Sequence, residues 1–185
     1  ADSISAFASA LADKTVSEVQ GYQEAKAEAE VIAQERLEAE AAAEAARKAE
    51  EERKAAEEAR LEMRQGIVDF ALQFEGNPYV YGGTSLTNGA DCSGFVMSVF
   101  AQFGYSLPRV AADQYNQSAK KSVEDLEPGD LIFYGSGISH VALYIGNGQI
   151  IHASTSASGI KISNYDYEAT VGVGTYIEAD GFFSE

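Results

Sequence analysis

The stretch Asp91-Cys92-Ser93-Gly94 leads directly into five apolar residues at helical spacing: Phe95, Val96, Val99, Phe100 and Phe103. The pattern predicts a helix that begins at about Cys92 and buries this stripe. A helix N-terminus carries unpaired backbone N–H groups and the positive end of the helix dipole, and both stabilise an anion. We therefore expect the pKa of Cys92 to be lowered, so that more of it is nucleophilic thiolate.

Cys92 is the only cysteine among 185 residues. It cannot form an intramolecular disulfide, and it has no cysteine partners for a zinc or iron–sulfur site, so we expect no metal and no other cofactor. A free cysteine is often simply a small buried hydrophobic side chain. The polar neighbours of Cys92 and the glycine behind it argue against that interpretation and favour a catalytic nucleophile.

The composition narrows the class of protein. A hydrophobic content of 45% is ample for a compact core. A net charge of −16 argues against nucleic acid as a partner, because phosphate binding needs clustered Lys and Arg. No apolar run reaches the roughly 20 residues of a transmembrane helix. The chain starts without an initiator Met or a signal peptide, so we expect either a mature form or a recombinant segment whose export signal is not visible in the sequence. A single cysteine fits a cytosolic protein as well as an exported bacterial protein without disulfides.

The composition changes sharply near residue 65. Residues 16–64 are dominated by Ala, Glu, Lys and Arg, contain no proline and have glycine only at Gly21, which predicts a long helix. Residues 1–15 are mixed small and apolar, and are expected to be frayed or to form a short helix. We expect residues 1–65 to form a helical spacer or coiled-coil segment and residues 66–185 to form the globular domain.

The role of the long helix is open on sequence alone. Its large apolar residues do not form a sustained heptad seam: Val31, Ile32, Leu37, Leu61 and Met63. Three interpretations remain, namely a solvated single-helix spacer, weak self-association as a coiled coil with a second copy or with residues further upstream, and a helix folded back on the globular domain.

Residues 66–185 have the pattern of an α+β domain, with helices first and an antiparallel sheet after them. The spacing of Ile67, Phe70 and Phe74 predicts a short helix that stops at Gly76-Asn77-Pro78. A second, polar helix is expected over residues 111–119. Strands are expected over residues 131–134, 140–145, 149–153, 160–163 and 171–178.

The two histidines of the chain, His140 and His152, flank the turn Gly146-Asn147-Gly148. Register decides whether they meet. A two-residue loop pairs His152 with Leu143 and puts the histidines on opposite faces of the sheet, whereas a loop that includes Gly146 pairs His152 with Ala142 and puts them on one face. The glycines around Asn147 are compatible with the longer loop.

Each histidine alone is more often a structural residue. Together with a cysteine at a helix start, however, they supply the three parts of a thiol hydrolase. We assign Cys92 as the nucleophile, His140 as its base, and His152 as the group that fixes the tautomer of His140.

Six segments, in their order and spacing, resemble the NlpC/p60-type cell-wall endopeptidase family: residues 79–83 (Tyr-Val-Tyr-Gly-Gly), 91–95 (Asp-Cys-Ser-Gly-Phe), 107–109 (Leu-Pro-Arg), 127–131 (Glu-Pro-Gly-Asp-Leu), 139–148 (Ser-His-Val-Ala-Leu-Tyr-Ile-Gly-Asn-Gly) and 151–153 (Ile-His-Ala). The resemblance covers residues 66–185 and leaves residues 1–65 outside. It implies a papain-like α+β fold, with helices packed on an antiparallel sheet, preceded here by the long N-terminal helix.

The resemblance also implies hydrolysis of peptidoglycan stem peptides or muropeptides, typically between γ-D-glutamate and the following diamino acid, by a secreted or cell-wall-associated bacterial enzyme. The family's Cys, His and third polar residue fall on Cys92, His140 and His152. Tyr79 and the Cys92 backbone N–H are expected to line the oxyanion hole. Asp91 and Ser93 match positions that bind the free amino group of the stem peptide in some relatives, although Asp91 is equally well placed as the N-cap of the Cys92 helix.

Three other functions remain open. A wall amidase or an acyltransferase of the same broad fold also uses Cys and His. A surface scaffold with a helical stalk and a catalytically silent domain is a third class, against which the complete Cys/His/His set argues.

Overall fold

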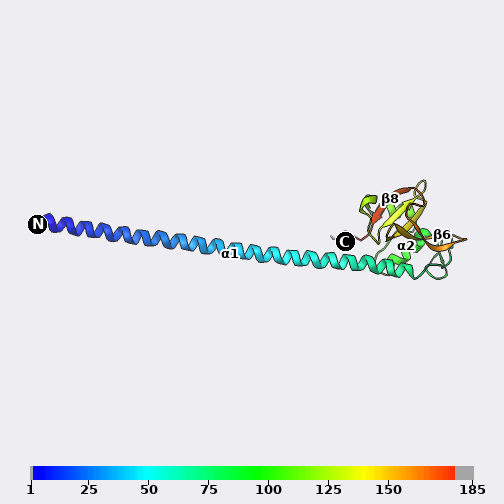
Figure 1. The fold of residues 1–185 in the computed structure, drawn as a ribbon, viewed down its shortest axis with the longest axis horizontal. Helices are drawn as coiled ribbons and strands as arrows, with labels where there is room; N and C mark the ends of the chain where they lie inside the picture. Colours follow the sequence, from blue (N-terminus) through cyan, green and yellow to red (C-terminus); the bar gives the residue numbers. More distant parts are fainter. Residues whose placement is uncertain (1, 178–185) are drawn as a thin grey trace. The chain divides into compact units, whose positions relative to one another are not determined.

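The computed structural model describes residues 2–177, apart from the side chain of Asp2. Its first element, α1 (Asp2–Leu72), is continuous (Figure 1). It includes residues 2–15 and passes through Gly66, so the separate short helix expected over residues 67–74 is the last part of α1. No proline interrupts the chain before Pro78, and the cost of one helical glycine, about 1 kcal/mol, is small beside the summed propensity of its neighbours. The chain forms two compact units, Ala1–Lys54 and Ala55–Glu185.

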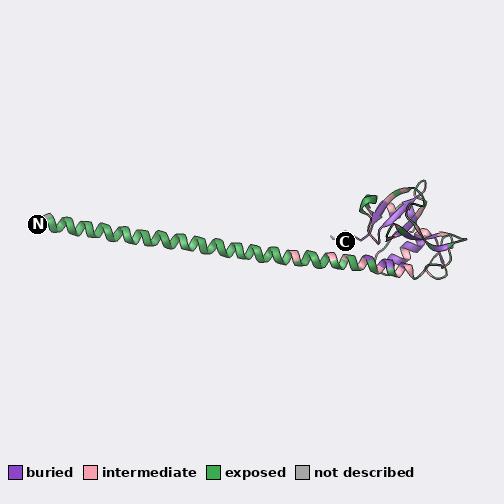
Figure 2. Ribbon diagram, in the orientation of Figure 1, coloured by how far each residue is buried: buried purple, intermediate pink, exposed green. Residues whose placement is uncertain are grey.

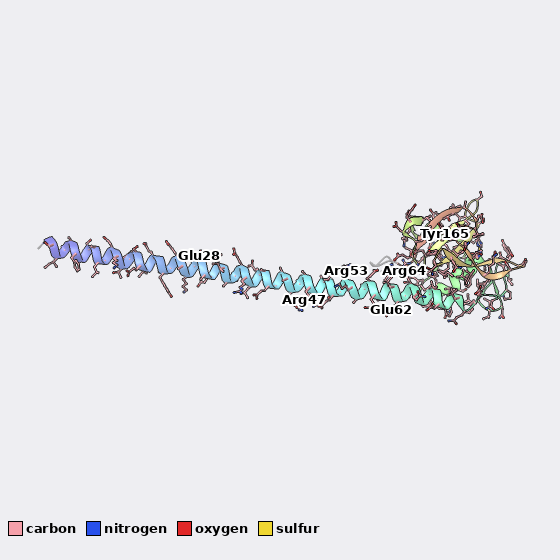
Figure 3. The ribbon with its side chains drawn as sticks, viewed as in Figure 1. Glu28, Arg47, Arg53, Glu62, Arg64 and Tyr165 are labelled. Atoms are coloured by element: carbon pink, nitrogen blue, oxygen red, sulfur yellow. The ribbon has the colours of Figure 1, made fainter. Side chains whose placement is uncertain are left out.

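The first unit is helix alone. Its described side chains are exposed from Ser3 to Ala49 (Figure 2), including Ile4 and Phe7, which are 80% and 72% exposed. Charged side chains such as Glu28 and Arg47 extend from it (Figure 3), and Arg47 forms an ion pair of 2.7 Å with Glu44 one turn earlier. Such exposed pairs each contribute only a few tenths of a kcal/mol, about 0.3–0.5. No helix in the described part of the chain is both long enough and apolar enough to cross a membrane.

The second unit, which we call the globular unit, contains a six-stranded sheet in which every neighbouring pair is antiparallel. The strand order is β3-β8-β4-β5-β6-β7. The strands are β3 (Ala119–Lys121), β4 (Leu131–Tyr134), β5 (His140–Gly146), β6 (Gln149–Thr155), β7 (Gly159–Asn164) and β8 (Thr170–Thr175). A separate two-stranded sheet joins β1 (Thr84–Ser85) and β2 (Gly89–Ala90). The helices are α2 (Cys92–Ala101), α3 (Ala111–Gln117) and the 3-10 turn η1 (Val123–Asp125).

This arrangement confirms the predicted α+β class. The five predicted strands appear as β4 to β8, and their ends agree with the prediction to within two residues except at the end of β8. That strand ends at Thr175, three residues before Glu178, the predicted end, which lies outside the described residues. Strand β3 was not predicted, because Ala-Lys-Lys carries neither the alternation nor the β-branched residues of a strand. It lies at the edge of the sheet beside β8, and edge strands are commonly short and lysine-rich.

The main core lies between one face of the sheet and α2. Phe95, Val99 and Phe100 of α2 are fully buried, and they belong to the same cluster as Leu131 and Phe133 of β4. The residues that alternate with these in β4, Ile132 and Tyr134, belong to a smaller cluster on the opposite face. The central strands are therefore buried on both sides (Figure 2), which gives a rigid support for residues at the strand ends.

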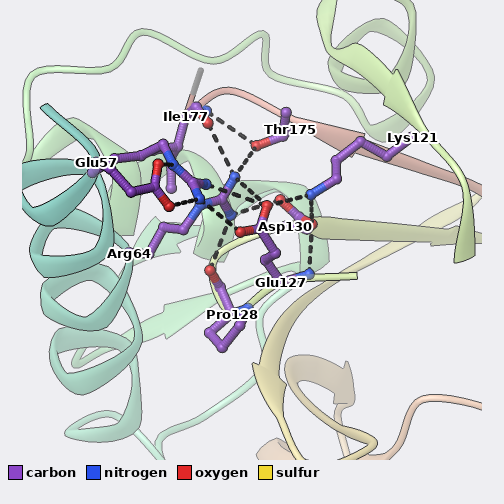
Figure 4. Close-up of polar contacts among 9 residues, drawn as sticks. Glu57, Arg64, Lys121, Glu127, Pro128, Asp130, Thr175 and Ile177 are labelled. Atoms are coloured by element: carbon purple, nitrogen blue, oxygen red, sulfur yellow. Dashed lines mark hydrogen bonds and ion pairs between the residues drawn. The ribbon is translucent and has the colours of Figure 1, made fainter. Parts of the chain in front are cut away.

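A buried polar network joins the last part of α1 to the sheet (Figure 4). Arg64, only 3% exposed, donates to Asp130 (2.7 Å) and to the carbonyl oxygens of Pro128 and Ile177 (both 3.0 Å). Lys121 of β3 donates to Glu127 (2.7 Å) and to Asp130 (2.8 Å). Hydrogen bonding by Arg60, aided by Lys121, lowers the pKa of Glu127 to about 2. The charges after residue 54 of α1 are thus part of the globular unit.

Candidate active site

Helix α2 begins where the sequence predicted, because Asp91 caps it. The Asp91 side chain accepts a hydrogen bond of 2.8 Å from the backbone N–H of Gly94. Gly94 itself is required by close packing, since a Cβ atom there would lie 2.1 Å from the carbonyl oxygen of Gly83. The loop of residues 79–83 can therefore lie directly against the first turn of α2, beside Cys92.

The Asp91 carboxylate is surrounded by donors. Besides Gly94, it accepts from the backbone N–H of Gly82 (2.9 Å) and from both terminal nitrogens of Arg109 (2.8 and 2.9 Å). Burial alone would raise the pKa of Asp91, but the hydrogen bonds from Arg109, Gly94 and Gly82 bring it below its ordinary value. Ser93 is buried and its hydroxyl accepts from Arg109 at 3.0 Å. The N-cap interpretation of Asp91 is thus observed, and its carboxylate is already occupied by partners within the chain.

Cys92 lines a cleft of about 460 Å³ together with Tyr79, Asp91, Ser93, Arg109 and Ile138. The backbone N–H groups of Val141 and Ser93 favour the thiolate, but burial is the larger effect and raises the pKa of the Cys92 thiol. This direction is opposite to the one expected from the helix N-terminus. The reason is that the thiol is half-buried under the start of β5, and the sequence pattern does not reveal this desolvation.

The two histidines lie on one face of the sheet. Leu143 pairs with Ile151, and the register shifts between Tyr144 and Gly146, which places Ala142 opposite His152. The predicted register that puts both histidines on one face is therefore observed. Gly146 does not join the loop, however: it pairs with Gln149 as the last residue of β5, and the irregularity between Tyr144 and Gly146 takes up the extra residue. His140 Nε2 and His152 Nδ1 are 2.7 Å apart, in hydrogen-bonding contact. His140 follows Ser139, which lines the same cleft as Cys92, and its strand β5 packs against α2, the helix that Cys92 begins.

Both imidazoles are neutral near pH 7. Burial lowers the pKa of His140 to about 4, and burial together with the charges of His140 and Lys161 lowers the pKa of His152 to about 3. His152 is fully buried, whereas His140 is partly exposed. A neutral His140 is able to accept a proton, and His152, in hydrogen-bonding contact with it, is able to hold its ring in place.

Three tyrosines lie around the cysteine and the histidine pair. Burial and the neighbouring Cys92 raise the pKa of Tyr79, which keeps its phenol protonated and able to donate a hydrogen bond near the thiol. Tyr167, in the segment between β7 and β8, packs on His152 with ring centroids 5.3 Å apart. Its neighbour Tyr134 packs on His140 at 6.1 Å. The histidine pair thus lies among aromatic rings.

The structure adds three residues to the site that were not assigned from the sequence. Arg109 belongs to one of the segments that resemble the family. The predicted globular domain, residues 66–185, has only four basic residues, so Arg109 could have been noticed as a partner for Asp91. Ser163, which contacts His152, and Tyr167 gave no signal, because serine and tyrosine are frequent in strands and turns. Only the pairing of β6 with β7 brings Ser163 beside the histidines.

Comparison with known proteins identifies the class to which this fold and site belong. A sequence model described as the NlpC/P60 family matches residues 76–174, which is more than half of the chain. The protein belongs to the NlpC/P60 family.

Curated relatives match the same region. A "Probable endopeptidase p60" of Listeria seeligeri is 46% identical over 100 residues, covering 53% of this chain and 18% of the relative. The "Gamma-D-glutamyl-L-lysine dipeptidyl-peptidase" of Bacillus subtilis is 40% identical over 103 residues, covering 53% of this chain and 34% of the relative. The chain therefore spans well under two thirds of the length of either relative.

Solved structures agree on the fold. The peptidoglycan hydrolase RipB of Mycobacterium tuberculosis is 36% identical with a TM-score of 0.60, over 64% of this chain and 67% of RipB. The NlpC/p60 domain of the peptidoglycan hydrolase SagA is 34% identical with a TM-score of 0.57, over 60% of this chain and 97% of that domain. In both comparisons more than a third of this chain lies outside the matched region.

Proposed function

We propose that the protein is a bacterial cysteine peptidase that hydrolyses peptidoglycan stem peptides, at the bond between γ-D-glutamate and the following diamino acid. The observation that carries the proposal is the His140–His152 pair at 2.7 Å beside a cleft that contains Cys92 at a helix N-terminus. The bond assignment rests on the relative named as a γ-D-glutamyl-L-lysine peptidase. We further propose that it acts outside the cell, secreted or associated with the wall.

The proposed reaction starts from a neutral Cys92 thiol and a neutral His140 imidazole. Because Nε2 of His140 is committed to His152, the nitrogen left for the thiol is Nδ1. Cys92 gives its proton to Nδ1 as the sulfur attacks the carbonyl carbon of the scissile amide, and the C–N bond breaks as His140 protonates the leaving amine. A thioester on Cys92 remains. Water, deprotonated by His140, then attacks the thioester, and the thiol returns with release of the new carboxylate.

The oxyanion formed in each attack needs hydrogen-bond donors. We assign this role to the Cys92 backbone N–H and the protonated hydroxyl of Tyr79, which lines the same cleft. For Asp91 and Ser93 we propose an indirect role in substrate binding. They hold Arg109 in the wall of the cleft, and the occupied Asp91 carboxylate leaves little room for a substrate amine.

The test is digestion of purified peptidoglycan and of soluble muropeptides, with mass spectrometry of the products. We expect new γ-D-glutamyl carboxylates and free diamino acid amines. Cys92→Ala should lower the rate by at least about 10³-fold, because it removes the nucleophile. Ser156→Ala is the matched control, since it also removes one γ atom but lies exposed in the β6–β7 turn; it should leave the rate unchanged.

The products separate the competing functions. Cleavage between sugar and stem peptide would identify an amidase instead, and transfer to an added amine without net hydrolysis would identify an acyltransferase. Absence of any product from the intact protein would favour the silent scaffold.

A further inference from the structure

The hydrogen-bonded chain of the site extends one residue beyond the histidine pair. His152 Nε2 lies 3.0 Å from the hydroxyl oxygen of Ser163, on the neighbouring strand β7. Both ring nitrogens of His152 are therefore engaged, Nδ1 by His140 and Nε2 by Ser163. His152 is fully buried, so the partner of Nε2 cannot be replaced by bulk solvent without a change in structure.

The protons in this chain can be arranged in two ways. A neutral imidazole carries one N–H, and the contact between His140 and His152 holds a single hydrogen. In the first arrangement both rings carry the hydrogen on Nε2, so His140 donates to His152 and His152 donates to Ser163. In the second both rings carry it on Nδ1, and each hydrogen bond is reversed. Only the first leaves Nδ1 of His140 bare to accept the proton of Cys92.

We propose that Ser163 is a positioning residue that stabilises the first arrangement, by accepting the Nε2–H of His152 so that both histidines can keep the Nε2–H tautomer. The proposal rests on the proposed function for the link from tautomer to catalysis. Its physical basis is the high cost of a buried donor without a partner, which exceeds that of an unpaired acceptor. Without the Ser163 hydroxyl, a hydrogen on His152 Nε2 would be such a donor, and the pair would shift towards the Nδ1–H tautomer.

The other groups around the pair act in different ways. Tyr134 of β4 and Tyr167 after β7 contact His140 and His152 by their rings, at centroid distances of 6.1 and 5.3 Å. Lys161 of β7 acts through its charge, which disfavours a second proton on His152 and so helps to keep it neutral. Ser163 is the hydrogen-bond partner of His152 Nε2. Burial and the charge of Lys161 keep His152 neutral, and only a neutral imidazole has a choice of tautomer.

The first experiment does not depend on activity. In the Cys92→Ala protein, nitrogen-15 NMR of the imidazoles at pH 7 reports the tautomer of each histidine, and the chain has only two. We expect both to be Nε2–H. Adding Ser163→Ala should give His152 a substantial Nδ1–H fraction. Asn164→Ala, at the adjacent position whose side chain points to the opposite side of β7, should leave the spectrum unchanged. An Nδ1–H His152 in the parent, or no change with Ser163→Ala, would overturn the proposal.

The second experiment uses the enzyme with Cys92 intact. Ser163→Ala should lower kcat about tenfold with KM within about twofold, because the loss lies in the proton transfer and not in substrate binding. Ser163→Thr keeps the hydroxyl and should recover most of kcat. A loss confined to KM, or an equal loss in Asn164→Ala, would contradict the assignment. If the intact protein cleaves no stem peptide, the proposed function fails, and the NMR experiment still decides the role of Ser163.

Discussion

At Cys92, two effects of opposite sign act on the same sulfur. The first turn of α2 and the backbone N–H groups of Val141 and Ser93 favour the thiolate, while burial favours the thiol and is the stronger. His140 does not stabilise the thiolate with a positive charge, because burial lowers the pKa of His140 to about 4 and keeps its imidazole neutral. The resting site therefore holds a neutral thiol and a neutral imidazole, and charge appears only when a proton moves.

This balance predicts how the thiol titrates. Because the folded-state pKa of Cys92 is raised, the thiolate is absent at neutral pH and forms only as the pH rises above the ordinary value of about 8.5. We expect the rate of alkylation by iodoacetamide, followed by mass spectrometry, to be low and flat from pH 5 to pH 8 and to increase above that range. Cys92 is the only cysteine, so all labelling reports on it. The control is the same protein in denaturant, where the rate should rise through about pH 8.5; a fast rate already at pH 6 in the folded protein would show a thiolate–imidazolium pair instead.

Residue identity carried much of the site prediction. With one cysteine and two histidines, the candidates for nucleophile and base are almost unique, and the structure brings them to adjoining elements. The direction of the Cys92 pKa and the part played by Ser163 were out of reach, because they depend on burial and on which strand lies beside β6. Neither quantity is encoded in the spacing of residues along one segment.

The β5–β6 hairpin is the element on which the histidine pair depends. Three consecutive residues at its turn have positive φ: Gly146 (96°), the last residue of β5, and the loop residues Asn147 (54°) and Gly148 (73°). This backbone conformation accommodates one extra residue in β5 and sets the register that places His152 opposite Ala142. The sequence limited the hairpin to two registers, and the choice between them depended on the backbone conformation at Gly146.

The loop therefore has a measurable conformational requirement. Gly146→Ala should lower the free energy of unfolding by about 1–2 kcal/mol, since a side chain at φ 96° is strained, and its Cβ would also lie 3.4 Å from Pro128. Chemical denaturation measures this. Asn147→Gly is the matched control at the next position, where asparagine already tolerates a left-handed conformation, and should change stability by less than about 1 kcal/mol. Equal effects of the two changes would mean that the loop does not depend on Gly146.

Helices and strands differed in how far the sequence predicted them. Residues 16–64 were predicted helical from composition, but the continuation through Gly66 to Leu72 was not, because a glycine and a change of composition resemble a boundary. The central strands were found by their apolar runs. The edge strand β3 was missed, since its stability comes from pairing with β8 and from the contacts of Lys121, not from its own residues.

For the whole molecule, the polar network indicates how much of α1 the globular unit needs. Asp130 is fully buried and is bound by Arg64 and Lys121. Arg60 adds a contact of 2.9 Å to Glu127. Both arginines precede residue 66, so a cut at the change in composition would remove them, whereas a cut after Lys54 keeps them and follows the division between the two units. We propose that the first unit is a spacer that catalysis does not require.

Two shortened proteins test this division. The protein lacking residues 1–54 should keep the thermal stability of the globular unit and its activity on soluble muropeptides within about twofold. The protein lacking residues 1–65 should lose about 3–5 kcal/mol of stability, because Asp130 keeps only Lys121 as a charged partner and the carbonyl of Ile177 loses its donor. Thermal and chemical denaturation together with product analysis provide both measurements.

Single substitutions in the full chain separate the network from the rest of the helix. Arg64→Met should be destabilising by a similar amount, whereas Arg47→Met, which breaks an ion pair whose side chains are 67% and 64% exposed, should change stability by less than about 1 kcal/mol.

The activity of the protein lacking residues 1–54 reports on the role of the first unit. A large gain would mean that the first unit blocks the cleft, and a large loss would mean that it completes the substrate site, within one chain or from a second copy. Unchanged activity together with a concentration-dependent mass of the full chain, which the shorter protein does not show, would assign weak self-association to this helix.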